Sequence, residues 1–152
     1  MPLIGRTVSS LAMVASLACA SAEMAGPPVG FNHASAVAAC GPADEAAVQI
    51  FFTPTEVVSG LPVTPYITIY VAEAPAALVG RTLSLAGANA EGSAQFRANA
   101  EDFESAESGT LTVNSVGADK SIQGQVDITF PNAAPVRGTF SAKWLPNQVF
   151  CN

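Results

Sequence analysis

The side chains that could carry out chemistry in this 152-residue chain are few and scattered. His33 is the only histidine, so the chain has no histidine cluster for zinc or copper and no credible Ser-His-Asp set. The acidic stretch of Glu101, Asp102, Glu104 and Glu107 offers oxygen ligands of the kind that calcium prefers. Its spacing differs from that of an Asp-x-Asp-x-Asp-Gly loop, and it lacks the glycine that the sharp turn needs. We therefore interpret this stretch as a solvated loop or an edge strand.

Carboxylate pairs and phosphate-binding loops give no stronger signal. Glycoside hydrolysis needs two carboxyl groups that face each other across a cleft about 5 to 9 Å wide. Glu56, Glu73 and Asp127 fall on different predicted strands or loops. The chain also has no Gly-Lys-Ser/Thr phosphate loop, no Gly-x-Gly-x-x-Gly and no Gly-x-Ser-x-Gly. The sequence thus predicts no catalytic set, no metal site and no cofactor, and we do not expect an enzyme.

A set of aromatic side chains is a candidate for binding. If the apolar residues that alternate along Tyr66–Ala72 face the core, Tyr66 and Tyr70 face outward, and Phe51 joins them if its strand pairs with theirs. An exposed aromatic stripe on a sheet suits a protein, a glycan or a second subunit. In the alternative interpretation, the N-terminal lead with Phe31 or a neighbouring loop covers this face.

The cysteines predict one structural disulfide. Cys19 lies in the export signal, which leaves Cys40 and Cys151 as an even pair in an oxidising compartment. A bridge between them would close a loop of about a hundred residues. In the chain-entropy model, such a bridge stabilises the folded state by about 4 to 5 kcal/mol. Neither cysteine belongs to a Cys-x-x-Cys motif or has a histidine beside it, so we do not expect a reactive thiol.

The first 22 residues have the features of a secretory signal peptide. The N-terminal segment carries the single positive charge of Arg6, and a short apolar run that ends in alanines follows it. Ala20-Ser21-Ala22 supplies the small side chains that signal peptidase I needs, and cleavage there would make Glu23 the new N-terminus. In the alternative, Ser16-Leu17-Ala18-Cys19 is a lipobox and a lipid on Cys19 anchors the chain to a bacterial membrane. We favour the first route, because the order of Ser16 and Leu17 is the reverse of that in a usual lipobox.

The composition predicts one acidic domain. About 130 residues remain after cleavage, which is enough for a single core. Removal of Arg6 leaves five basic residues against twelve acidic ones, a net charge near −7. The basic residues are scattered singly, so nucleic-acid binding is not expected. We divide the chain into a signal peptide (1–22), a flexible lead (23–40) and a single β domain (41–152).

Apolar and polar residues alternate along most of this domain, which predicts strands. The pattern is strictest over Lys120–Phe130 and Val136–Trp144, and Gly109–Val116 precedes them. The turns between these three segments are too short for a parallel crossover, so they predict an antiparallel C-terminal meander. Four less regular segments bring the count to about seven strands. They are Ala47–Thr53, Tyr66–Ala72, Arg81–Ala86 and Ser93–Ala98.

The expected fold is an all-β, antiparallel sandwich of about seven strands. The long connection from Pro54 to Pro65 favours two sheets, and the alternative is a partly closed β-barrel. Helical evidence is confined to Ala34–Ala39 and Ala74–Leu78, which are too short to form helices unaided.

We expect the protein to be an exported, non-catalytic module with a binding or structural role, periplasmic or secreted or, in the alternative, anchored through Cys19. Such folds carry recognition on loops and faces, and fold class alone does not identify the protein or glycan partner. The alternative function is a carrier for a small apolar ligand inside a barrel.

Overall fold

The computed structural model describes residues 28–150, and this part of the chain is all-β. It contains nine strands, one short 3₁₀ helix, η1 (Pro75–Leu78), and no α-helix among the described residues. No helix in residues 28–150 is long and apolar enough to span a membrane. The strands are β1 (His33–Cys40), β2 (Ala46–Thr53), β3 (Tyr66–Val71), β4 (Thr82–Ser84), β5 (Gly92–Arg97), β6 (Phe103–Ser105), β7 (Ser108–Val116), β8 (Ile122–Thr129) and β9 (Val136–Phe150).

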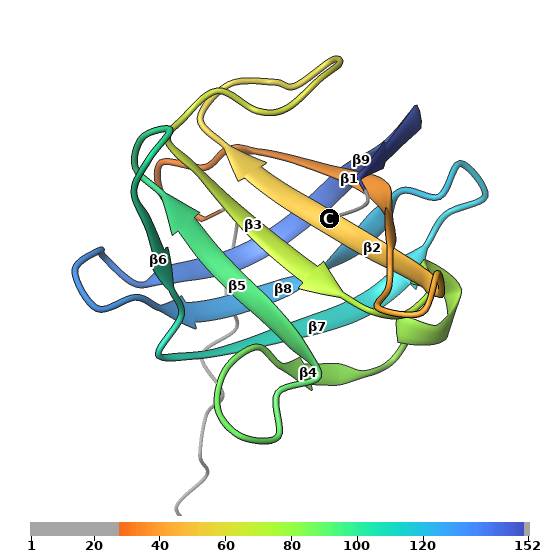
Figure 1. The fold of residues 1–152 in the computed structure, drawn as a ribbon. Helices are drawn as coiled ribbons and strands as arrows, with labels where there is room; N and C mark the ends of the chain where they lie inside the picture. Colours follow the sequence, from red (N-terminus) through yellow and green to blue (C-terminus); the bar gives the residue numbers. More distant parts are fainter. Residues whose placement is uncertain (1–27, 151–152) are drawn as a thin grey trace, which may run out of the picture.

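The nine strands form one hydrogen-bonded sheet in the order β4-β7-β8-β9-β1-β2-β3-β5-β6. The sheet is curled into a half-barrel, so that β2, β3 and β5 cross in front of β7, β8 and β9 (Figure 1). The prediction of a purely antiparallel fold was wrong at one pair, because β1 runs parallel to β9, with Ala34 opposite Ala142. A parallel pair is possible here because the whole domain forms the connection between the two strands.

The seven predicted strands are all present as β2, β3, β4, β5, β7, β8 and β9. The last three are consecutive antiparallel neighbours, as expected for the meander. The sequence analysis missed β1 and β6. Of the acidic stretch, Glu104 lies in β6 at the edge of the sheet, and Glu101 and Asp102 precede that strand. The interpretation as a loop or edge strand is therefore confirmed for these residues.

Strand β1 corrects the prediction of a flexible lead over residues 23–40. Its last eight residues, His33–Cys40, form a strand that pairs with β2 on one edge and β9 on the other. The alanines that resembled a short helix alternate instead, and Ala36 is fully buried in the core. Backbone pairing on both edges outweighs the weak helix propensity of alanine.

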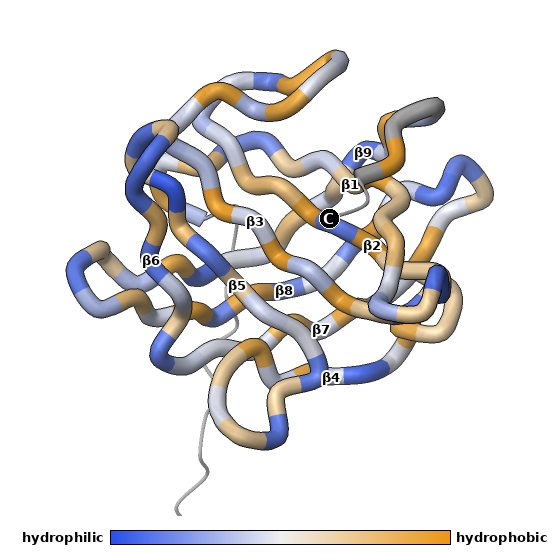
Figure 2. The backbone as a smooth tube through the Cα atoms, viewed as in Figure 1, coloured by the Kyte–Doolittle hydropathy of each residue, from blue (hydrophilic) through white to orange (hydrophobic). Residues whose placement is uncertain are grey.

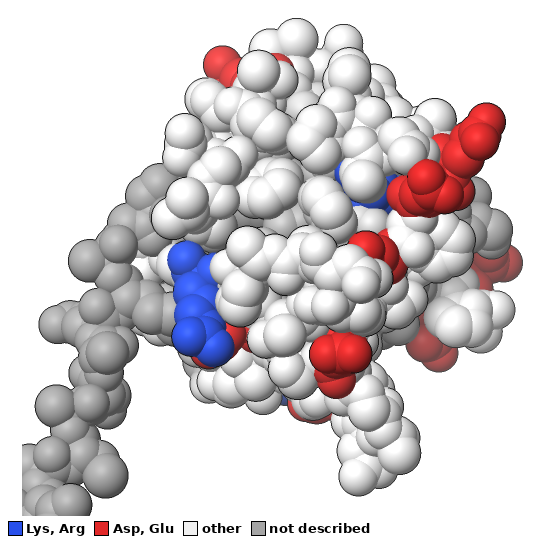
Figure 3. Space-filling model, turned by 90° about the vertical axis from the view of Figure 1, so that its left-hand side faces the viewer, with Lys and Arg blue, Asp and Glu red and all other residues white. Residues whose placement is uncertain are grey.

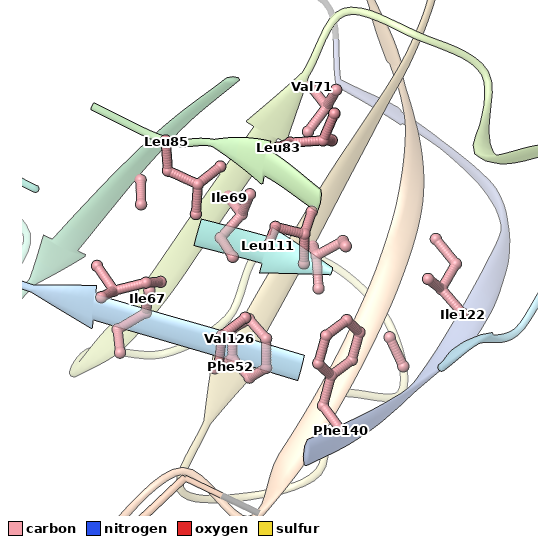
Figure 4. Close-up of a cluster of buried hydrophobic side chains, with 14 of the residues drawn as sticks. Phe52, Ile67, Ile69, Val71, Leu83, Leu85, Leu111, Ile122, Val126 and Phe140 are labelled. Carbon is pink, nitrogen blue, oxygen red and sulfur yellow. The ribbon is translucent and has the colours of Figure 1, made fainter. Parts of the chain in front are cut away.

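The main core lies between the two halves of the curled sheet. The alternation of apolar and polar residues along the strands places one apolar set inside (Figures 2 and 4). Phe52 of β2 and Phe140 of β9 meet across the core with ring centroids 5.2 Å apart and the rings nearly perpendicular. Gly124 of β8 lies opposite Phe140 in the sheet. Because this glycine has no side chain, the ring of Phe140 fits above the strand.

We expect Gly124→Ala to lower the free energy of unfolding by about 1 to 3 kcal/mol, since overpacking a core costs that much. A Cβ atom at Gly124 would overlap the carbonyl oxygen of Thr112 and lie 3.0 Å from the ring of Phe140. Urea denaturation measures the loss. Gly109→Ala is the control, because its Cβ would approach no atom closer than 3.3 Å. A Gly124 variant as stable as the wild type would contradict this packing.

Candidate functional site

The outer face of β2, β3 and β5 carries a row of polar and aromatic side chains. Phe51 pairs with Thr68, and Thr68 pairs with Gln95, so these residues cross the sheet in one line on its outer side. Tyr66 and Arg97 form the next line. The inward-facing residues of β3 belong to the main core, as the alternation predicted.

A loop covers part of this face. The β2–β3 loop (residues 54–65) places Val57 against a small second cluster of Val37, Phe51 and Leu145. Phe51 is therefore only 1% exposed. The covering segment is this loop and not the N-terminal lead, because Phe31 packs on the core side against Phe96, with ring centroids 6.3 Å apart.

The predicted aromatic stripe is thus only partly open. Tyr66 is half-buried and meets the ring of Phe51 edge-on, with the centroids 6.0 Å apart. Tyr70 is also half-buried, and its hydroxyl donates a hydrogen bond of 3.0 Å to the carbonyl oxygen of Cys40. Tyr66 and the buried Phe51 border one hollow, together with polar side chains from all three strands, whereas Tyr70 does not line it.

That hollow, the outer-face groove, has a volume of about 310 Å³, near the lower end of the range for small-molecule sites. The Nε2 group of Gln49 donates a hydrogen bond of 2.8 Å to Oγ1 of Thr68, which fixes the orientation of the amide. Its lining residues are Gln49, Phe51, Leu61, Tyr66, Thr68, Gln95 and Arg97. The groove therefore combines an aromatic edge with two amides and a guanidinium group.

Arg97 has no carboxylate partner among the described residues. Its guanidinium carbon lies 5.3 Å from the ring centroid of Phe103. The other described arginines are paired, Arg81 with Glu73 and Glu91, and Arg137 with Asp127. On a chain with twice as many acidic as basic residues, an arginine that faces a groove without an acid is available to a ligand.

The β2–β3 loop adds apolar surface beside the groove. It projects from the body of the molecule above β2 and β3, and apolar residues colour much of its length (Figures 1 and 2). Val58, Leu61 and Val63 are 73%, 64% and 82% exposed. They make up three of the seven large apolar side chains that are exposed in the described part of the chain. Leu61 also lines the groove.

A second, polar hollow of about 200 Å³ surrounds the start of β1. It is lined by His33, Ser35, Glu56 and Lys143, among others, and Nζ of Lys143 lies 3.4 Å from Oε1 of Glu56. The hydroxyl of Ser35 is buried and has no hydrogen-bond partner in residues 28–150. The Ser35 hydroxyl is therefore not hydrogen-bonded to the imidazole of His33, although both residues line this hollow.

The acids considered for catalysis are not brought together. Glu56, Glu73 and Asp127 each form an ion pair with a different basic residue. Within residues 28–150, no three His, Cys, Asp or Glu side chains are grouped so that they could hold a metal ion. On the face drawn in Figure 3, the basic side chains lie in separate places and do not form a stripe.

Cys19, Cys151 and the predicted signal peptide lie outside the described residues. Cys40 is the last residue of β1, and the last pair in the β1–β9 ladder joins Ala39 to Phe150. In the sequence, Cys40 follows Ala39 and Cys151 follows Phe150. The disulfide between Cys40 and Cys151 stays a prediction, because Cys151 lies outside the described residues.

The sequence analysis did not identify Gln49, Gln95 or Arg97 as site residues. Their alternation with apolar neighbours was visible, but which strands lie side by side was not. No protein-family model, curated protein or solved structure was found to match this chain.

We expect Cys40 and Cys151 to resist alkylation until the protein is reduced. The double variant Cys40→Ser, Cys151→Ser should unfold with a free energy lower by about 2 to 5 kcal/mol, because the unfolded chain is no longer cross-linked. Mass spectrometry after alkylation and urea denaturation measure the two effects. Reductant should destabilise the wild type and leave the double variant unchanged. Ready alkylation of both thiols without reductant would refute the bridge.

Proposed function

We propose that the mature chain is an exported, non-catalytic binding module and that its outer-face groove binds a glycan. One observation carries this proposal. The half-buried ring of Tyr66, the amides of Gln49 and Gln95, and the unpaired guanidinium of Arg97 line one groove from three neighbouring strands. All four side chains stand on paired strands, so their backbone positions are fixed before a ligand arrives, and the amide of Gln49 is also oriented by its hydrogen bond to Thr68.

The chemistry of these groups matches that of a sugar. A sugar ring presents C–H groups on its faces and hydroxyl groups around its edge. The C–H groups can pack on an aromatic side chain such as Tyr66, and the hydroxyls can exchange hydrogen bonds with amides, which both donate and accept. The fork of donors on Arg97 suits a carboxylate or a pair of hydroxyls. The exposed Leu61 at the rim adds apolar contact.

The side chains that line the groove support binding without catalysis. None of its lining residues carries a carboxylate. Glycoside hydrolysis uses two carboxyl groups flanking the scissile bond, so a sugar held here would meet no general acid and no nucleophile of that kind.

The filled interior supports this module over a carrier with a ligand inside a barrel. Phe52, Phe140 and the other members of the main core occupy the space between the halves of the sheet. We also propose that the fold is better described as a partly closed barrel than as a sandwich. Continuous pairing from β4 to β6 in one sheet supports it over a sandwich of two separate sheets.

Export is proposed from the sequence alone, and the intact mass of the protein from its native host tests it. Cleavage by signal peptidase I predicts a chain that begins at Glu23 and carries no lipid. A chain that begins at an acylated Cys19 would replace this route with membrane anchoring. A chain that still begins at Met1 would refute export by either route.

We expect the protein to bind at least one class in a panel of immobilised neutral, N-acetylated and uronate-bearing oligosaccharides. Tyr66→Ala and Arg97→Gln should each weaken that binding about tenfold or more, as loss of a central contact does. Biolayer interferometry measures the affinities. Tyr70→Phe is the matched control, because Tyr70 stands on the same face of β3 and does not line the groove.

Thermal unfolding checks that each variant is folded. Two outcomes would contradict the proposal: no oligosaccharide class is bound, or a folded Tyr66→Ala variant binds as tightly as the wild type. In the first case a protein partner on the β2–β3 loop becomes the better explanation, since the loop exposes Val58, Leu61 and Val63.

A further inference from the structure

An apolar hollow of about 330 Å³ lies at one end of the half-barrel, away from the outer-face groove. The end of β1, the start of β2, η1, the end of β7 and β9 all contribute to it. Six of its ten lining residues are alanines, which are too small to fill the space between these elements. Trp144, the only tryptophan of the chain, forms part of the wall and packs against the main core.

Lys120 also lines this hollow, and its backbone has an unusual conformation. Its φ angle is +63°, at the end of the turn that joins β7 to β8. The turn is closed by hydrogen bonds from the N–H of Lys120 to the carbonyl of Gly117 and from the N–H of Gly117 to the carbonyl of Ser121. Glycine is favoured at such a position because a side chain is strained there.

The contrast with Asp44 shows that Lys120 is exceptional. These two are the non-glycine residues with positive φ among residues 28–150. Aspartate adopts this conformation far more readily than lysine. Strain of this kind tends to be retained where the side chain has a use.

The ammonium group of Lys120 lies beside Trp144, and both residues line the hollow. Its Nζ atom lies 5.3 Å from the ring centroid of Trp144. It forms no ion pair with a described carboxylate, although the neighbouring Asp119 is acidic. Oδ1 of Asp119 instead accepts hydrogen bonds from the N–H and the hydroxyl of Ser121, which lower the pKa of Asp119. The ammonium group of Lys120 is therefore not held in an ion pair by any carboxylate of residues 28–150.

We infer that this hollow binds a small amphipathic anion, whose apolar chain packs between the alanines and Trp144 and whose carboxylate contacts Lys120. The volume is near the lower end of the range for small-molecule sites, roughly 300 to 1,000 Å³. This site shares no lining residue with the outer-face groove and does not depend on the proposed glycan binding.

Decanoate is the probe, and the fluorescence of Trp144 is the readout. Because no other tryptophan is present, a saturable change in emission reports directly on this wall. We expect decanoate to bind more tightly than decanol, and decyltrimethylammonium to bind more weakly still, since Lys120 supplies a positive charge beside the hollow. Ala46→Leu should abolish binding, because Ala46 is exposed at the edge of the hollow and its larger replacement fills it without disturbing the core.

Two substitutions test Lys120. Lys120→Gln removes the charge, and Lys120→Gly also removes the strained side chain. Both should weaken decanoate binding roughly fivefold, the upper range for one partly exposed ion pair. Lys120→Gly should keep or raise the unfolding temperature, since glycine suits the turn. Lys143→Gln, which removes the same charge from the outer face, should leave the affinity unchanged.

The inference is overturned if decanoate causes no saturable change in Trp144 emission. It is also overturned if Lys120→Gln and Lys120→Gly bind decanoate as the wild type does, or if decyltrimethylammonium binds as tightly as decanoate. The glycan-binding experiment tests residues of the outer-face groove, which are different from those of this hollow. Failure of either experiment therefore leaves the other interpretable.

Discussion

The pairing of β1 on both of its edges is the constraint on which the rest of the structure depends. β1 joins the group β4-β7-β8-β9 to the group β2-β3-β5-β6, and it brings the first and last strands of the domain side by side. Its two faces then serve different surfaces. Ala36 belongs to the main core, whereas Val37 belongs to the small cluster under the β2–β3 loop. Without this strand, the two halves of the sheet would have no shared ladder to hold the core between them.

The two faces of the curled sheet differ in how far they are covered. The inner face is filled, with Phe52 and Phe140 in edge contact across it. The outer face is covered only in part, because Val57 of the loop covers Phe51 and leaves Tyr66 half-buried beside polar neighbours. This partial cover produces a groove with mixed lining, and a groove of that kind is better suited to a ligand that is both apolar and hydrogen-bonding than to either type alone.

Local patterns in the sequence predicted the strands well, since each face of a strand repeats every second residue. That signal identified seven strands and the outward direction of Tyr66 and Tyr70. It failed at β1, where alanines carry little strand preference, and at the three-residue β6. It also could not identify the groove, because Gln49, Gln95 and Arg97 meet only through the pairing order β2-β3-β5. Pairing order depends on contacts distant in sequence, which periodicity does not record.

The central claim is that the groove across β2, β3 and β5 is the binding surface. Backbone amide chemical shifts, followed by NMR during titration with the tightest oligosaccharide of the panel, test it most directly. The account predicts that the largest changes fall on Gln49, Thr68, Gln95 and Arg97, and that the amides of β7 and β8 change little. Changes centred on another surface, or none at saturating concentration, would contradict the account.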